Sequence, residues 1–532
     1  MMNTANIIFW SEVTTFPLLT TLTIVPLATV IAVLLSPSSV IALRLGLASA
    51  VATALLSIYM VSIFDSGHKG IQLFEHVENI NFTYSVGLDG ANILFVLLTA
   101  ILSFLALVYL LTTRRSRDKI QVACILGYEG ILIGAFVAMN AMQFWFWCLL
   151  ELVPIVLITI RAGSGQKRRW VVGLLLQHWG SGLLMTFTGF MLLAFGVMGS
   201  GDTLTFEWLV LIENKNVLEY STLIFFLLFF GFAIRMPLFP FHGWLPVLAE
   251  HGSVASATIF IVGLKLGIYA VIRFILPILP DVAQQWSWFV LTLGLIGIFY
   301  GVVLALMQIN IRRLLAFSVI GHTGMLIIGV FDFNLYGLES SILLSTGFGL
   351  AAAGIALSIG MIYKRTHTAY IPRLGGMFET SAALAFLFVI SALSTMGMPG
   401  TPGFDGVHLL IDGTIKNHGW ILSIAILIGN VLTAALLLRA FQQIFIATPK
   451  RLQPPYTYSA LPGSAGPSPR NERVIAVVVC SLLVGIGFYT TPWLQMIDQN
   501  VSAISKLHPV KYNNKHAELM IVPNHNKDNK HE

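Results

Sequence analysis

Long runs of hydrophobic residues, separated by short polar or basic segments, occupy most of the 532-residue chain. A helix that crosses a bilayer core of about 30 Å needs about 20 mostly apolar residues. Fourteen runs approach or exceed that length, so we predict an all-α polytopic membrane protein with about 14 transmembrane helices. The predicted helices lie near 15–35, 40–64, 87–112, 120–138, 140–160, 170–198, 220–249, 253–279, 284–308, 311–331, 336–362, 378–413, 419–446 and 472–495.

Two of these runs contain clustered prolines and are predicted to be broken helices. The sequence MPLFPFHGWLP occupies 236–246, and MGMPGTPGF occupies 396–404. Proline removes a helical hydrogen bond, so such a segment needs protein or water around it inside a membrane. Each break falls in the fourth helix of a five-helix block. Because an odd number of helices reverses the direction of insertion, the pattern predicts two inverted repeats, 120–279 and 284–446, each with a broken helix.

The remaining segments flank these repeats. Residues 1–119 are expected to form three transmembrane helices, and the first of them lacks the basic segment and cleavage site of a signal peptide. Residues 447–532 are expected to form a loop, a last transmembrane helix and a polar tail.

Basic residues are concentrated in every second loop, including 114–119, 161–169 and 364–373, whereas the opposite loops hold Lys69, Lys215 and Lys416. Basic loops usually face the cytoplasm, so both termini are expected on the other side.

Composition narrows the possible functions. The chain is 56% hydrophobic and 10% charged, and its net charge of +6 follows the loop pattern, which argues against nucleic-acid binding. Cys124, Cys148 and Cys480 lie singly in apolar runs, so we expect no disulfide, iron–sulfur cluster or structural zinc site. No glycine-rich nucleotide motif is present. We therefore expect no cofactor on this chain.

Ionisable residues within the predicted helices are the candidates for chemistry, because burying them in a bilayer costs about 2.5–3.5 kcal/mol on insertion scales. A buried lysine can take up and release a proton, so Lys265 is the leading candidate, with a fixed ion pair as the alternative. Arg235 stays protonated and is expected to tune a partner instead. The full set of candidate site residues is Lys265, Glu151, Glu129, Arg235, His322, His242, Asp405 and His408.

Each remaining candidate has a functional and a structural interpretation. Glu129 and Glu151 are possible counter-charges, while His242 and His322 either titrate or simply pack. Asp405 and His408 would share a helix face and either end a proton relay or cap the half-helix. We expect five of these residues to form an inward-facing polar belt across the membrane centre: Glu129, Glu151, Arg235, Lys265 and His322.

Several stretches carry a family resemblance over about 85–410. They are SVGLDGANILFVLLT (85–99), YEGILIG (128–134), FAIRMPLFPFHGWLP (232–246), GLKLGIYAVIRF (263–274), INIRRLLAFSVIGHTG (309–324) and GMPGTPGF (397–404). With them, the chain resembles the antiporter-like membrane subunits of complex I and its photosynthetic relatives. The resemblance is to the chain 4 type, which is subunit M or its counterpart in the photosynthetic NAD(P)H:plastoquinone form.

The resemblance implies proton translocation within an NAD(P)H:quinone oxidoreductase, alongside other membrane subunits. It implies that NAD(P)H, iron–sulfur clusters and quinone bind to partner subunits and not to this chain. It also implies an integral protein of a bacterial inner membrane or a cyanobacterial thylakoid membrane.

The chain departs from the family pattern at several positions. The resemblance implies ionisable residues where Leu149, Gly173 and Val407 stand, a lysine at Arg235, and acidic and histidine residues near Val247 and Ala249. Glu151 is two residues from the usual acidic position, a rotation of about 200°, so it need not reach the usual partner.

These departures keep three further hypotheses open. They are a subunit of a multisubunit cation/proton antiporter, a paralogue serving CO2 uptake with a soluble carbonic-anhydrase-like partner, and a scaffold that only joins its neighbours.

Overall fold

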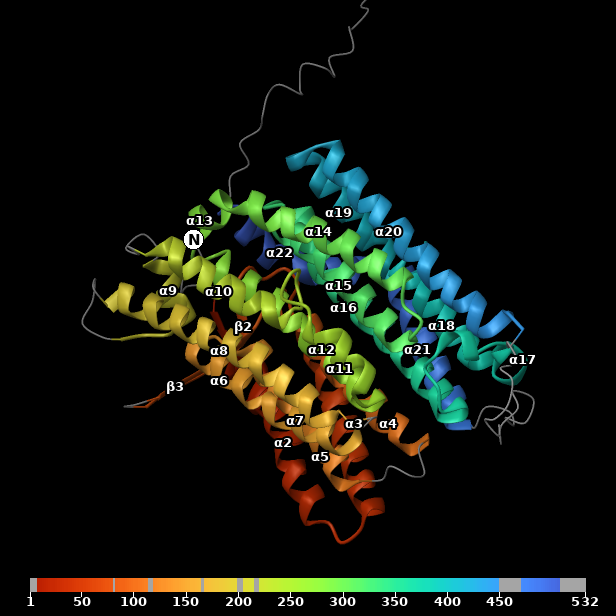
Figure 1. Ribbon diagram of the computed structural model, residues 1–532. Helices are drawn as coiled ribbons and strands as arrows, with labels where there is room; N and C mark the ends of the chain where they lie inside the picture. The colour runs from red at the N-terminus through yellow and green to blue at the C-terminus, as the bar shows by residue number, and fades with distance from the viewer. Residues whose placement is uncertain are drawn as a thin grey trace, which may run out of the picture.

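The computed structural model describes residues 7–79, 82–112, 118–163, 167–198, 204–214, 220–448 and 470–507. Helices lie side by side through most of the molecule (Figure 1). Within the described residues, twelve helices are long and apolar enough to cross a membrane, and two shorter apolar helices, Ser221–Arg235 and Ala382–Thr395, each lead into a break. The helical membrane fold is therefore confirmed, and this inventory is compatible with the predicted count of about 14.

The first helices pack against one side of the bundle. They are α2 (Leu18–Leu35), α3 (Ser39–Ile63) and α4 (Ile93–Thr112), and α2 runs along α5 (Lys119–Val137) (Figure 1). The Ser38 side chain accepts a hydrogen bond from the Ile41 N–H and so caps the start of α3.

The helices predicted as the first block follow in the expected order. After α5 come α6 (Ala141–Leu150), α7 (Leu152–Ala162), α8 (Arg168–Met198), the short α9 (Trp208–Glu213), α10 (Ser221–Arg235), α11 (Trp244–His251) and α12 (Val254–Ala270), which continues as a π-helical turn, Val271–Ile275. The helix predicted over 140–160 is thus divided at Glu151 between α6 and α7.

The second block begins after the short α13 (Pro280–Gln285). It contains α14 (Ser287–Leu306), α15 (Ile311–Val330), α16 (Leu335–Thr366), the short α17 (Met377–Thr380), α18 (Ala382–Thr395), α19 (Pro402–His418) and α20 (Trp420–Phe441), which ends in a π-helical turn, Gln442–Ile446. A short 3-10 turn, Ile371–Arg373, precedes α17.

Both predicted helix breaks are present. Between α10 and α11, the Trp244 indole donates a hydrogen bond to the Ile234 carbonyl across the break at 3.0 Å. Between α18 and α19, Gly397 and Gly400 have φ of +71° and +84°, values that favour glycine. The Ile234 carbonyl, freed at the first break, therefore finds a hydrogen-bond partner within the protein, as a broken helix inside a membrane requires.

A small sheet was not predicted. Strands β1 (Ile7–Phe9), β2 (Ile71–Asn79) and β3 (Phe82–Leu88) are ordered β1-β2-β3, with β1 and β2 parallel and β2 and β3 antiparallel. Glu75 of β2 accepts hydrogen bonds from the Leu19 and Thr20 N–H groups at 2.7 and 3.0 Å. It thereby satisfies donors at the start of α2 that the helix leaves without partners.

The end of the chain also differs from the prediction. The last predicted helix, 472–495, ends early: α21 covers Arg470–Phe488, and a separate amphipathic helix, α22 (Thr491–Ser505), packs against α16. Pro492 at the start of α22 explains the break, because proline tolerates the first turn of a helix better than its interior. Part of the region predicted as a polar tail is therefore helical.

Contacts between loops agree with the predicted alternation. Asp89, before α4, pairs with Arg273, after α12, and β-bridge Val86–Ala138 joins two further connections at that end. At the other end Arg365 pairs with Glu472 at 2.5 Å. We call the end with the basic loops the basic side and the opposite end the outer side. Lys215, residues 449–469 and the tail after 507 lie outside the described residues.

Candidate functional site

A buried ion pair between Arg235 and Glu151 forms the centre of the site. Arg235 is the last residue of α10, directly before the break, and Glu151 lies between α6 and α7; the two are 8% and 0% exposed. Their side chains form an ion pair. The guanidinium also lies 4.6 Å from the centre of the Trp179 ring, a favourable cation–π contact.

Tyr128 of α5 extends this cluster. Its hydroxyl donates a hydrogen bond to Glu151 Oε1 at 2.5 Å, so the carboxylate has a neutral and a charged partner. Gly263 of α12 makes the approach possible: a Cβ there would lie 1.9 Å from the Tyr128 hydroxyl and 2.9 Å from Glu151. The Gly263 carbonyl in turn accepts from Arg235 at 3.4 Å.

Glu151 reaches Arg235 although it stands two residues from the usual acidic position. Its backbone keeps helical dihedral angles, φ −59° and ψ −27°, between α6 and α7, and its side chain forms the ion pair with Arg235. Glu151 is therefore a counter-charge of Arg235 in this structure. Leu149, at the usual acidic position, is 38% exposed and faces out of the bundle.

Lys265 and His322 lie in the interior beyond this pair. Lys265 of α12 is 3% exposed, and within the described chain no hydrogen bond or ion pair engages its ammonium group, so a fixed ion pair has no support. His322, near the middle of α15, stacks on Phe348 with ring centres 4.3 Å apart. The two are close enough to interact electrostatically.

Glu129, one residue after Tyr128, is fully buried in α5. Neither of its carboxylate oxygens has a hydrogen-bond partner among the described residues. An unpaired buried carboxylate is costly, so such a group usually holds a proton or meets water. All five residues that were expected to form the polar belt are thus buried.

The other three candidates lie at the helix breaks. His242 is buried in the first break, with its ring 4.8 Å from that of Tyr300. Asp405 and His408 do not form a common site. Asp405 accepts a hydrogen bond from Thr490, whereas the exposed His408 side chain lies 3.7 Å from Asp412.

The positions of Val407 and Gly173 also differ from the pattern that the family resemblance implies. Val407 is buried and apolar, and nothing lies within 4 Å of the position that a Cβ on Gly173 would occupy. Neither position supplies an ionisable group. No set of three or more His, Cys, Asp and Glu side chains in the described ranges could hold a metal ion.

Several polar contacts of the structure were not predicted from the sequence. Tyr128 directly precedes Glu129, and this adjacency was the available signal. The pair Asp89–Arg273 is buried, with 2.7 Å between the charged atoms, and Arg273 lies over the Trp208 ring. This pair joins outer-side connections and lies away from the belt.

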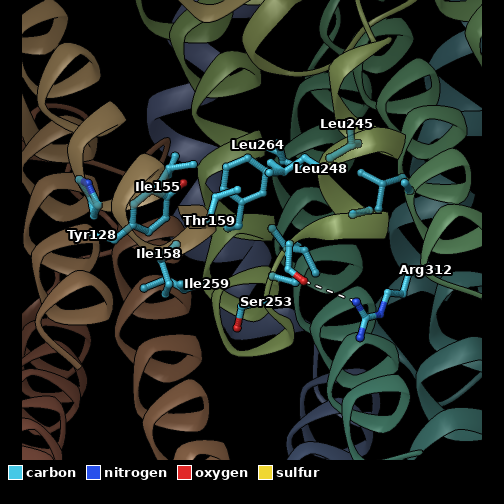
Figure 2. A pocket seen from close by; sticks show the side chains of 18 of the residues that line it. Tyr128, Ile155, Ile158, Thr159, Leu245, Leu248, Ser253, Ile259, Leu264 and Arg312 are labelled. Atoms are coloured by element: carbon cyan, nitrogen blue, oxygen red, sulfur yellow. Dashed lines mark hydrogen bonds between the residues drawn. The ribbon is translucent and has the colours of Figure 1, made fainter. Parts of the chain in front are cut away.

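A cavity of about 80 Å³ lies beside the ion-pair cluster, between α5, α7, α11, α12 and α15 (Figure 2). Tyr128 borders it on one side and Arg312 on the other. Most of the wall is apolar, and includes Ile155, Ile158 and Leu264. Arg312 donates a hydrogen bond to the Glu250 carbonyl at 3.2 Å, at the C-terminal end of α11. The cavity between Tyr128 and Arg312 is therefore lined mostly by hydrocarbon.

Curated proteins from several organisms are similar to this chain over most of its length. NADH-quinone oxidoreductase subunit M of Rickettsia typhi is 31% identical over 406 residues, which cover 75% of this chain and 80% of the relative. NAD(P)H-quinone oxidoreductase chain 4 of Synechococcus sp. is 27% identical over 466 residues, covering 84% of this chain and 82% of the relative.

Solved structures share the fold. A chain of respiratory complex I from Thermus thermophilus superposes with a TM-score of 0.82 and 24% identity, over 92% of this chain and 100% of that chain. A chain of the Mrp complex from Dietzia sp. gives a TM-score of 0.79 with 18% identity, over 92% and 99%.

The profile of one protein family matches residues 138–433, which is more than half of the sequence and includes both helix breaks and most of the buried charges described above. This integral membrane protein therefore belongs to the NADH:quinone oxidoreductase/Mrp antiporter transmembrane family.

Proposed function

We propose that this chain is a proton-translocating membrane subunit of a complex I-like NAD(P)H:quinone oxidoreductase. Relatives named subunit M and chain 4 support that assignment. NAD(P)H, the iron–sulfur clusters and quinone would bind to partner subunits, and this chain would bind other membrane subunits. Its membrane would be a bacterial inner membrane or a thylakoid.

The observation that carries the proposal is the burial of five ionisable side chains in the bundle interior. Glu129, Glu151, Arg235, Lys265 and His322 are between 0 and 8% exposed. Burial of this many ionisable groups in a membrane bundle is expensive and usually marks an ion pathway. Lys265 would carry the proton, because it can lose it and no described group fixes its charge.

In this proposal Arg235 tunes its neighbours and does not itself pass a proton on. Because arginine stays charged, Arg235 would hold Glu151 ionised and would order any water in the break between α10 and α11. His322, near the middle of α15, and His242, in the first helix break, would border the path as buried polar groups. Asp405, which accepts a hydrogen bond from Thr490, and the exposed His408 would act outside the buried group, beyond the second helix break.

Substitution of Lys265 tests the proposal. The complex is reconstituted in proteoliposomes with NADH and a soluble quinone, and proton uptake is recorded with a fluorescent dye. Lys265→Ala is expected to lower proton uptake by about 10²-fold or more, the range for a positioned proton carrier. Lys416→Ala, on the outer side and against Tyr336, is the matched control. Normal uptake by an assembled Lys265→Ala complex would refute the proposal.

A second candidate is cation/proton antiport, because the fold is also that of a chain in the Mrp complex. Proton movement that depends on a sodium gradient and persists without NADH and quinone would favour this candidate.

A soluble carbonic-anhydrase-like partner is a third candidate feature, suggested by the loss of ionisable groups at Leu149, Gly173 and Val407. Co-purification of a zinc protein with CO2 hydration activity would support it, and its absence from an intact complex would count against it.

A further inference from the structure

At the outer end of α15, a buried carboxylate lies against a histidine that reaches the surface. Asp332, in the connection between α15 and α16, is 0% exposed. Its Oδ2 accepts a hydrogen bond from the Thr414 hydroxyl at 2.8 Å, and its Oδ1 lies 3.4 Å from Nε2 of His418, the last residue of α19. The His418 side chain is 24% exposed, so the imidazole contacts both the buried carboxylate and the solvent.

The surrounding residues fix this arrangement. The Asn417 amide donates to the Asp332 carbonyl, and the Asn334 amide donates to the Gly413 carbonyl at 2.9 Å. A Cβ on Gly337 of α16 would lie 2.6 Å from the Asp332 Cβ. Burial raises the pKa of the Asp332 carboxyl well above its usual range, while the Thr414 hydrogen bond opposes this. Asp332 therefore retains a proton to higher pH than an exposed aspartate does.

Two polar side chains of α16, Ser341 and Ser345, lie at depths between this site and His322. His322 precedes Asp332 by ten residues, along α15 and the turn that follows it. Ten helical residues rise about 15 Å, which is half of a bilayer core of about 30 Å. Ser341 donates to the Leu326 carbonyl at 2.9 Å, one step below Asp332. Because the two helices are antiparallel and Phe348 stacks on His322, Ser345 lies between these levels. Its buried hydroxyl has no hydrogen-bond partner in the described structure.

The second broken helix offers no comparable group at mid-depth. Val407 occupies the position where the family has a glutamate, and it is buried among apolar atoms. His408 is exposed and Asp405 is bound to Thr490. Another buried carboxylate near this end, Glu339 of α16, interacts with Asp498 of α22 instead of with a histidine.

We infer that Asp332 and His418 form the proton-release site of this chain on the outer side. The inference rests on the proposed function and names the place where the translocated proton leaves the protein. Asp332 starts protonated and His418 neutral. The carboxyl O–H bond breaks as an imidazole N–H bond forms, and the imidazolium then gives a proton to water. No electron is transferred, and the pair is reset when a proton arrives from the interior.

Substitution of the carboxylate is the first test, made in the whole complex in proteoliposomes with NADH and a soluble quinone. Asp332→Asn keeps the size and the Thr414 contact but cannot release a proton. It is expected to lower proton uptake by about tenfold or more, because a positioned proton-transfer group contributes about 10²–10⁴-fold. Asp332→Glu should restore most of the rate. The control is Asp412→Asn, on the same helix as His418, whose side chain is half-exposed and lies beside His408.

The dependence on outer pH is the second test, and it also decides the question if Asp332→Asn fails to assemble. Thr414, Asn417 and Asn334 are neutral, so His418 is the titratable group that the described structure sets against Asp332. Acid on the outer side should inhibit release. The imidazolium that forms beside Asp332 favours the ionised carboxylate, and His418→Gln removes both this positive charge and the group that receives the proton. The variant should therefore lower proton uptake and move the inhibition midpoint upward by about one unit or more. A role confined to packing would leave that midpoint unchanged.

Two results would overturn the inference. One is a parental rate in Asp332→Asn together with an unshifted midpoint in His418→Gln. The other is loss of uptake in Glu339→Gln while Asp332→Asn remains normal. Lys265→Ala separates these results from failure of the proposed function: if that variant loses uptake while Asp332→Asn does not, translocation stands and only the exit is wrong.

Discussion

At the scale of single residues, the identity of each buried charge limits what it can do, and its partner decides what it does do. Arg235, at a position where the family resemblance implies a lysine, forms three contacts at once, with Glu151, the Trp179 ring and the Gly263 carbonyl. A planar guanidinium suits such a site, because it stacks and donates in several directions. The substitution therefore exchanges a group that can lose its proton for one that holds a fixed position.

Substitutions of Arg235 should separate charge from shape. Arg235→Met leaves the Glu151 carboxylate without its counter-charge, and breaking a buried pair from one side costs about 3–5 kcal/mol. We expect lower thermal stability of the purified complex and lower proton uptake. Arg235→Lys keeps the charge and restores a releasable proton, so its uptake should match or exceed that of the parent.

The double variant Arg235→Met with Glu151→Gln supplies the control, since it removes both charges and should recover part of the lost stability. A fully active Arg235→Met variant beside an inactive Arg235→Lys variant would contradict the role of Arg235 as a fixed tuning charge.

The sequence largely predicted which ionisable residues are buried, whereas it did not predict which of them form contacts with one another. A single charged residue in an apolar run signals burial by itself, and this criterion selected Lys265, Glu129, Glu151, Arg235 and His322. Contact with a partner depends on which distant helices lie face to face, as those carrying Glu151 and Arg235 do, and no local signal in the sequence gives that arrangement. Asp332 was missed for a related reason: it follows α15 in a short connection, where an aspartate ordinarily meets solvent.

At the scale of elements, the close approach of α5 and α12 determines the geometry of the site. Gly263 is where these helices meet, because its missing side chain leaves room for the Tyr128 hydroxyl. The requirement is steric and does not depend on the backbone dihedral angles of Gly263, which lies inside α12. Gly263 therefore stands two positions before Lys265 in the sequence and leaves the space that the Tyr128 hydroxyl occupies.

Gly263→Ala should therefore disturb the ion-pair cluster. The added Cβ would lie 1.9 Å from the Tyr128 oxygen, so Tyr128 or α12 must move, and overpacking of this kind costs about 1–3 kcal/mol. We expect reduced proton uptake and a lower melting temperature of the complex.

Tyr128→Phe added to Gly263→Ala should relieve part of this defect, because it removes the colliding oxygen. Gly180→Ala is the matched control, since nothing lies within 4 Å of its Cβ position. Equal stability of Gly263→Ala and Gly180→Ala would show that the approach of α5 and α12 is not tightly fixed.

Elements outside the apolar runs were harder to predict. The sheet of β1, β2 and β3 lies in a connection that hydropathy treats as a loop, and β1 reaches it from the start of the chain. Helix α22 has a polar face, so its composition resembles that of a solvated tail. In both cases the element is stabilised by what it packs against, and that information is spread over distant parts of the sequence.

At the scale of the whole molecule, helix count and loop charge together predicted the architecture. Apolar length identifies a span whatever it contacts, because every backbone group in lipid must be satisfied within the helix. The two breaks occur where proline and glycine cluster, as expected. The internal symmetry of 120–279 and 284–446, related by an axis in the membrane plane, stays a prediction that superposition of the blocks would test.

The orientation of the chain can be tested with single cysteines at the two ends of α14. Gln285→Cys lies on the outer side and Gln308→Cys on the basic side, in a Cys480→Ser background that removes the partly exposed native thiol. In sealed vesicles, a membrane-impermeant maleimide should label one position and not the other. Labelling of both positions from the same face would contradict the predicted topology.

The apolar cavity between Tyr128 and Arg312 has a consequence for energy conservation. A proton path that stayed open along its whole length would act as a short circuit and discharge the gradient that the rest of the complex builds. Ile155, Ile158 and Leu264 present hydrocarbon there, which no ion crosses readily without water. Such a wall acts as electrical insulation, and it blocks ions only while water stays out of the cavity. Ile158→Ser should therefore make the resting membrane leaky: a preformed pH gradient would decay faster in proteoliposomes without any substrate, while Val153→Ser, on the exposed face of α7, would leave that decay unchanged.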